Sequence, residues 1–156
     1  MLKKQVAILA AAQALLCIIS AYLISKISLI GKIGIALFYK EYKILRSGWK
    51  TFLLFFIIQL IIIGILYFLH SKRSRKTTVY TALGITAAAL VGLGFTYNDF
   101  LHTYTHRLLK ERFHMGFYLF WIGMIISCIF FIVQSALSRA GKQEASQLAE
   151  QTKPLK

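Results

Sequence analysis

The most reactive side chains of this 156-residue chain gather in one short segment. Residues 97–114 carry the only aspartate of the sequence and three of its 4 histidines. Asp99, His102 and His106 are spaced i, i+3 and i+7, which places them near one face if the segment is helical. Two imidazoles and a carboxylate are a recognised ligand set for a divalent metal such as zinc or iron. These three residues form the candidate metal site.

A plainer interpretation of the same residues is a polar turn where a helix leaves the membrane. The set has no second carboxylate and no cysteine, and His114 would join it only if the chain turned back. A haem between two histidines is not favoured, because such histidines must face each other at similar depth. His70 ends a different apolar run, and the expected topology puts it about one bilayer thickness from the other histidines. We therefore expect no cofactor.

Composition indicates which elements must position these residues. Hydrophobic residues make up 58% of the chain and charged residues 15%, against about 45–50% and about 25% in soluble domains. So apolar a chain is not intrinsically disordered. Its two cysteines, Cys17 and Cys128, lie inside apolar runs and do not form a disulfide framework. The composition is that of an integral membrane protein.

Four apolar runs are long enough to cross a membrane. Each has about 20 residues, the length that spans roughly 30 Å of hydrocarbon as a helix. The first run is longer than the apolar part of a signal peptide, so we expect an uncleaved span. The sequence predicts an all-α bundle of four transmembrane helices over residues 1–137, followed by a polar tail at 138–156. The predicted spans are residues 5–25, 51–70, 78–97 and 116–137.

The net charge of +14 comes from 19 lysines and arginines against 5 acidic residues. In so apolar a chain these cations indicate anionic lipid headgroups, not nucleic acid, as the partner. The short loop at residues 71–77 concentrates four of them, which predicts that this loop and both termini are cytoplasmic. We expect a multi-pass protein of the bacterial inner membrane. The cations of this loop are Lys72, Arg73, Arg75 and Lys76.

The first loop, residues 26–50, mixes apolar and basic residues and would lie on the opposite side of the membrane. We predict that it contacts lipid headgroups through Lys40, Lys43 and Arg46. An amphipathic or re-entrant helix over residues 34–46 is favoured. A short β-hairpin is the alternative, because Gly31 and Gly34 interrupt the segment.

Small residues indicate where the helices approach one another. Gly84, Ala88 and Gly92 follow an i, i+4, i+8 spacing, which makes a small-residue ridge in the third span. Gly116 and Gly123 lie one heptad apart in the fourth span. We predict that the third span lies centrally and packs on the first or fourth. The alternative is that its ridge forms a homodimer interface.

These features favour a non-enzymatic interaction, scaffold or accessory protein that acts through lateral contacts with helices and lipid. The interiors of the predicted spans hold no ionisable side chain, and the chain has no inverted repeat, unlike many carriers. The expected partners are the lipid bilayer and another membrane protein or a second copy. Two alternatives stay open: a metal-dependent membrane enzyme or redox accessory that uses Asp99, His102 and His106, or a minimal dimeric transporter.

Overall fold

The computed structural model describes residues 2–25, 47–102 and 111–151, and every element in this part of the chain is an α-helix. The helices are α1 (Leu2–Ser25), α3 (Gly48–Lys72), α4 (Arg75–His102) and α6 (Glu111–Gln151). Each contains a segment that is long and apolar enough to cross a membrane. The prediction of an all-α, four-span bundle is therefore confirmed. The spanning segments are Leu2–Ser25, Gly48–Lys72, Arg75–Asn98 and His114–Ser138.

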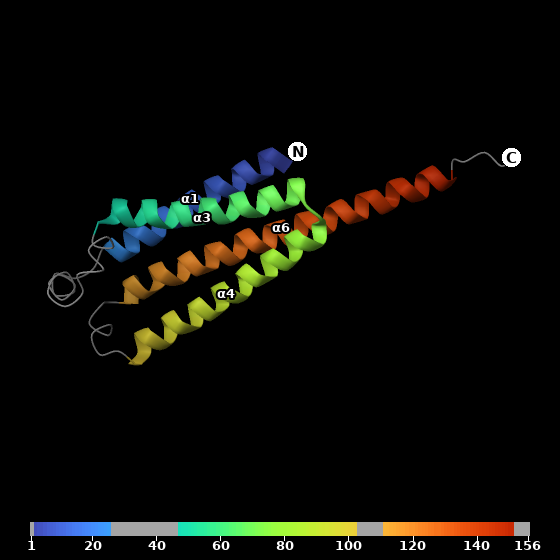
Figure 1. Cartoon of the computed structure of the whole chain (residues 1–156). Coiled ribbons are helices and arrows are strands. Elements are labelled where there is room, and N and C mark those ends of the chain that lie inside the picture. Colours follow the sequence, from blue (N-terminus) through green and yellow to red (C-terminus); the bar gives the residue numbers. More distant parts are fainter. Residues whose placement is uncertain (1, 26–46, 103–110, 152–156) are drawn as a thin grey trace.

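The helix α6 is the centre of the bundle. Figure 1 shows α1 and α3 side by side, with α6 running along this pair and α4 on the other side of α6. The most apolar stretch of α6 is 39% buried, and that of α4 only 17%. The prediction that the third span lies centrally is thus wrong. The reason is that α6 turns Gly116, Gly123 and Ser127 inward, which lets its neighbours approach closely.

A short turn joins α3 to α4 and makes them antiparallel neighbours. The backbone N–H of Arg73 donates to the carbonyl of Leu69 at 2.9 Å, which closes the last turn of α3. The N–H of Thr78 then donates to the carbonyl of Ser74 at 3.2 Å, in the first turn of α4. The turn is therefore tight, and its cations lie at the same end of the bundle as the start of α1 (Figure 1).

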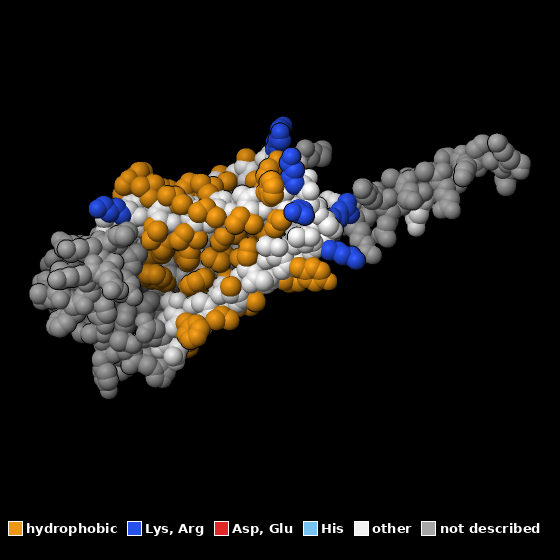
Figure 2. All heavy atoms as spheres, viewed as in Figure 1, with side chains coloured by type: hydrophobic (Ala, Val, Ile, Leu, Met, Phe, Trp, Pro, Cys, Tyr) orange, Lys and Arg blue, Asp and Glu red, His pale blue; other side chains and the backbone are white. Residues whose placement is uncertain are grey.

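Apolar side chains fill the interior and also cover the sides of the bundle. Two buried clusters, one centred on Phe55 and Phe120 and the other on Leu66 and Phe131, make the core. Figure 2 shows hydrophobic side chains over the flanks, with lysines and arginines toward the ends. Large exposed residues such as Phe95, at 71%, face outward. A surface of this kind is suited to hydrocarbon and belongs to a multi-pass membrane protein.

The C-terminal part of α6 runs through most of the segment that the sequence predicts as a polar tail. The apolar run ends at Leu137, but the helix continues to Gln151 and extends beyond the other helices (Figure 1). Good helix formers such as Lys142, Glu144 and Ala145 follow the span, and the only proline is Pro154. Local helix propensity therefore accounts for the extension.

Candidate functional site

The candidate metal site lies at the edge of the described chain. Asp99 and His102 are in the last turn of α4, whose helix ends at His102, and His106 lies outside the described residues. Within the part of the chain that the structure describes, no group of His, Cys, Asp or Glu side chains is arranged to hold a metal ion. The metal hypothesis stays a prediction from sequence.

The centre of the bundle contains two buried glutamines that bind the backbone of α6. The Nε2 of Gln13 on α1 donates to the carbonyl of Gly123 at 2.7 Å and to the hydroxyl of Ser127 at 2.9 Å. The Nε2 of Gln59 on α3 donates to the carbonyl of Phe120 at 3.0 Å. Both glutamines are at most 1% exposed. Two neighbouring helices are thus fastened to adjacent turns of α6.

Gly123 is the residue that makes room for these amides. A Cβ atom there would lie 2.7 Å from Oε1 of Gln13 and 3.2 Å from Nε2 of Gln59. One heptad earlier, Gly116 makes room for α1 itself, since a Cβ there would lie 2.8 Å from the backbone oxygen of Ser20. The hydroxyl of Ser20 donates to the carbonyl of Gly116. The two glycines therefore allow side chains of α1 and α3 to reach carbonyl groups of α6.

Polar contacts also hold the end of the bundle at which α1 begins and α3 ends. The Nδ1 of His70 lies 3.2 Å from the hydroxyl of Ser135, and Nε2 of Gln134 donates to Oε1 of Gln5 at 3.0 Å. These contacts join α3 and α1 to α6. Because they connect helix to helix, they serve packing, as interhelical hydrogen bonds do in membranes.

Cys17 and Cys128 are buried free thiols in the two apolar clusters.

The contact between α4 and α6 depends on Trp121. Its indole lies against Gly92, where a Cβ would be 2.6 Å from Cζ2, and its Nε1 donates to the hydroxyl of Thr96 at 3.1 Å. Thr96 in turn donates to the carbonyl of Gly92 at 2.7 Å. Gly92 is thus the member of the predicted ridge that packs within the bundle.

Gly84 and Ala88, the other members of that ridge, are exposed, and a Cβ at Gly84 would meet nothing within 4 Å. The expected packing of the whole ridge inside the bundle is therefore not what the structure shows. The buried residues of α4 include Ala82 and Ala89. Ala88 is turned about 100° away from Ala89 around the helix. The face that packs on α6 is set by Ala82 and Ala89, and the face of Gly84 and Ala88 is directed outward.

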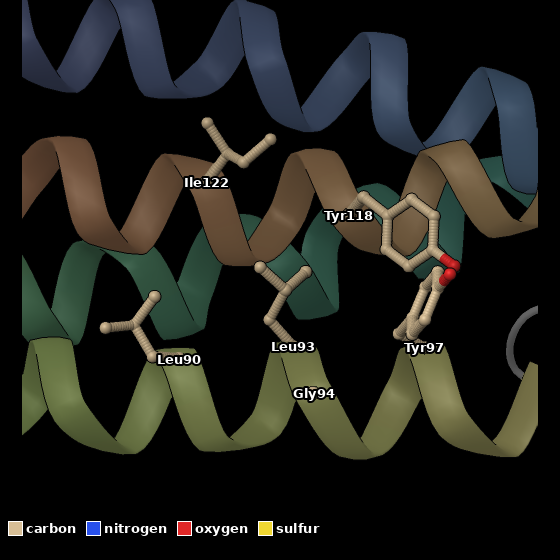
Figure 3. A pocket seen from close by; sticks show the side chains of 6 residues that line it. All are labelled: Leu90, Leu93, Gly94, Tyr97, Tyr118 and Ile122. Atoms are coloured by element: carbon tan, nitrogen blue, oxygen red, sulfur yellow. The ribbon is translucent and has the colours of Figure 1, made fainter.

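A cleft opens between α4 and α6, away from Trp121. It has a volume of about 480 Å³ and is lined almost wholly by apolar atoms. Figure 3 shows the two tyrosine rings at one end, with their hydroxyls close together, and aliphatic side chains along the rest. The ring centroids of Tyr97 and Tyr118 are 6.5 Å apart. The lining residues are Leu90, Leu93, Gly94, Tyr97, Tyr118 and Ile122.

Sequence reasoning missed this cleft, because its residues are ordinary in a membrane helix. The one signal was a second glycine, Gly94, two residues after Gly92 and so on a different side of α4. Gly92 is covered by Trp121, whereas a Cβ at Gly94 would meet nothing within 4 Å. Which of the two glycines is covered depends on where Trp121 lies, and this is a tertiary feature.

The structure describes some of the residues that the sequence predicts to contact lipid headgroups. Lys72, Arg73 and Lys76 are exposed at the α3–α4 turn, and Arg75 is half-buried there. Lys3 and Lys4 are exposed at the start of α1, which lies at the same end of the bundle as the α3–α4 turn. The other predicted contacts lie outside the described residues, as does the first loop: they are Lys40, Lys43 and Arg46.

Comparisons with known proteins add no family to this description. No protein-family model matches the chain, and no match was found among curated proteins or solved structures.

Proposed function

We propose that the protein is a non-enzymatic accessory or scaffold protein of the membrane, and that it acts through lateral contacts of α4 with a partner helix and with lipid. The observation that carries this proposal is the exposure of α4. Only 17% of its most apolar stretch is buried, against 28–39% for the other three spans. A helix with so little cover inside its own bundle has a large surface available to neighbours in the membrane.

The outward face of α4 favours a helix over lipid alone as the neighbour. Gly84 and Ala88 are exposed there, so a second backbone can come close. Close approach of small residues is a main source of helix association where water provides no driving force. Exposed Val91 and Phe95 extend the same side of the helix by one to two turns. The face therefore combines a small-residue contact with larger side chains beside it.

The proposed orientation puts the α3–α4 turn in the cytoplasm. Lys3, Lys4, Lys72 and Lys76 are exposed at one end of the bundle, whereas Lys50 is exposed near the opposite end. A dense group of cations beside the span ends favours the cytoplasmic side and contact with anionic lipid. A helical bundle also fits the inner membrane of a bacterium better than its outer membrane, where integral proteins are β-barrels.

Photo-crosslinking in the native membrane tests the proposal. A photoreactive amino acid replaces either Val91 on α4 or Ile61 on α3, two side chains that are 57% and 56% exposed. Position 91 should give a discrete protein adduct and position 61 only lipid adducts. The adduct mass distinguishes a second copy from another membrane protein. Lipid adducts alone at position 91, or the same protein adducts from both positions, would contradict a partner at this face.

A further inference from the structure

We propose that the α3–α4 turn binds the headgroup of phosphatidate, a glycerophospholipid that ends in a phosphate monoester, between the guanidinium of Arg75 and the imidazole of His70. This pair of side chains is called the turn site below. The inference rests on the proposed contact of the turn with anionic lipid and gives that contact a defined geometry. It does not involve the face of α4 with Gly84 and Ala88, so the partner-helix contact and the turn site can fail separately.

The end of the bundle with the α3–α4 turn carries positive charge that no nearby acidic residue balances. Six described cations lie there, four in the turn and two at the start of α1, and Figure 2 shows most of the lysine and arginine side chains at this end. None of the 5 acidic residues falls within residues 1–40 or 42–98. An anion from outside the chain is therefore the partner that complements this charge.

The acidic residues of the chain belong to other places. Asp99 and Glu111 lie at the opposite ends of α4 and α6 from the turn. Glu41 belongs to the first loop, outside the described residues. Glu144 and Glu150 follow the apolar run of α6 by seven or more residues, which is about 10 Å or more along the helix. No carboxylate of the described chain thus occupies the position that a bound phosphate would take.

Arg75 differs from the other cations of the turn, because its side chain is half-buried whereas the other three are exposed. Its charge acts on the imidazole of His70, which is also half-buried, so the two side chains lie near each other. A guanidinium has five N–H donors and no acceptor, and a partly buried one needs oxygen atoms as partners. Two such donor groups side by side, without a carboxylate in this part of the chain, indicate a bound anion.

The imidazole of His70 is held by α6 in a way that leaves one ring nitrogen for the ligand. Its Nδ1 lies 3.2 Å from the hydroxyl of Ser135, and the ring centroids of His70 and Phe131 are 6.3 Å apart. Ser135 is buried, so Nδ1 is directed into the bundle. When the hydroxyl donates to Nδ1, the proton of the neutral imidazole is on Nε2, which then serves as a donor to the ligand.

The donors of the turn site match three oxygen atoms on one phosphorus. The fork of Arg75 takes two phosphate oxygens, and Nε2 of His70 takes a third. A phosphate monoester has three terminal oxygens and a charge of about −1.5 to −2 at pH 7, whereas the phosphodiester of other glycerophospholipids has two such oxygens and a single charge. The exposed cations of the turn add attraction without a fixed geometry. The turn site therefore favours phosphatidate over phosphatidylglycerol.

The membrane places a lipid phosphate at the level of the turn. The apolar run of α3 ends at Leu69, and the first cation, Lys72, follows about 5 Å further along the helix. Large apolar side chains of α3 and α4 face outward before the turn and after it, such as Phe68 at 58% and Leu83 at 50% exposed. A phosphate bound at the turn can therefore extend its acyl chains along these helices, which inorganic phosphate cannot do.

Native mass spectrometry of the full-length protein in detergent tests the ligand. Dioctanoyl phosphatidate and dioctanoyl phosphatidylglycerol are titrated in parallel, and the dissociation constant of the first bound lipid is compared. Phosphatidate should bind roughly tenfold more tightly, as one further hydrogen bond to a charged group contributes. Equal affinities would overturn the turn site and leave the proposed headgroup contact standing, whereas binding of neither lipid would contradict both. Inorganic phosphate that competes as well as phosphatidate would overturn the choice of a lipid.

Arginine variants separate a defined site from diffuse charge. Arg75→Gln should weaken phosphatidate binding roughly tenfold. Arg73→Gln removes the same charge from an exposed position two residues earlier and should weaken binding by no more than about twofold. Arg75→Lys keeps the charge but loses the fork of donors, so it should resemble Arg75→Gln. Equal losses from Arg75→Gln and Arg73→Gln, in proteins with unchanged thermal unfolding, would refute the site.

Two variants of His70 test the second donor. Asparagine keeps a polar atom near the position of Nδ1, where it can still contact Ser135, but has no group in place of Nε2, whereas glutamine offers an N–H near Nε2. His70→Asn should lower the affinity for phosphatidate several-fold and leave that for phosphatidylglycerol unchanged, and His70→Gln should stay closer to the parent protein. An unchanged ratio of the two affinities in a folded His70→Asn protein would overturn the assignment of His70.

Discussion

The amide of Gln13 reaches across the bundle to the backbone of Gly123, with Nε2 of the glutamine 2.7 Å from the carbonyl oxygen of the glycine. The contact exists because position 123 has no side chain, since a Cβ there would lie 2.7 Å from Oε1 of the same glutamine. The hydrogen bond of the glutamine on α1 thus depends on the glycine on α6. In a membrane, such interhelical hydrogen bonds and close contacts at small residues help to determine which helices pack together, because the hydrophobic effect provides no driving force there.

Gly123→Ala should destabilise the bundle by about 1–3 kcal/mol, as overpacking a tight interior does. The added methyl group would displace the Gln13 amide, and with it the two hydrogen bonds to Gly123 and Ser127. Gly64→Ala is the control, because its Cβ meets nothing within 4 Å. That change should be neutral or slightly stabilising, since alanine is favoured over glycine in a helix by about 0.5–1 kcal/mol. Thermal unfolding in one detergent compares them, and equal stability of the two variants would contradict the tight contact.

The stacking of Trp121 on Gly92 predicts a coupled pair. Gly92→Ala alone should lower the unfolding temperature, because its methyl group would overlap the indole. In a Trp121→Leu background the same change should cost much less, since the flat ring is gone. A double-mutant cycle measures the coupling, which for contacting residues is about 0.5–3 kcal/mol. Additive effects would show that the two residues do not share this contact.

Orientation is tested at the two ends of the bundle. In a background where Cys17 and Cys128 are alanine, Ser74→Cys marks the α3–α4 turn and Lys50→Cys marks the opposite end. A membrane-impermeant thiol reagent should label position 50 in intact cells and position 74 only after permeabilisation, because basic turns are retained in the cytoplasm. The reverse pattern would place the termini outside.

The metal hypothesis makes its own prediction. If Asp99, His102 and His106 bind a divalent metal, its affinity should fall as the pH drops through about 6.5, because the ligands are neutral imidazoles that protonation removes. Metal content of the purified protein is measured across this range, with His102→Gln/His106→Gln as the control. A surface contact of the same histidines with an anionic partner would instead strengthen at low pH. No bound metal at neutral pH would leave only the plainer interpretation.

The sequence predicts the four spans and the two packing glycines of α6 for different reasons. Hydropathy over about 20 residues reports membrane crossing directly. Gly116 and Gly123 were identified by their heptad spacing, and they lie where α1 meets α6. In α4 the same reasoning misassigned Gly84 and Ala88, because small residues occur on most of its sides. The side of α4 that packs is the one with the buried Ala82 and Ala89 and with Gly92 under Trp121, and the cleft opens beside it at Gly94.

The central claim is that the face of α4 with Gly84 and Ala88 contacts a partner helix in the membrane. It is tested most directly by the yield of the protein adduct from a photoreactive residue at position 91, in protein that also carries Ala88→Leu or Leu83→Phe and stays in its native membrane. Both changes enlarge an exposed residue of α4, but Leu83 lies about 140° around the helix from Ala88. We predict that Ala88→Leu abolishes the adduct and that Leu83→Phe preserves it. An adduct that survives Ala88→Leu undiminished would contradict the account.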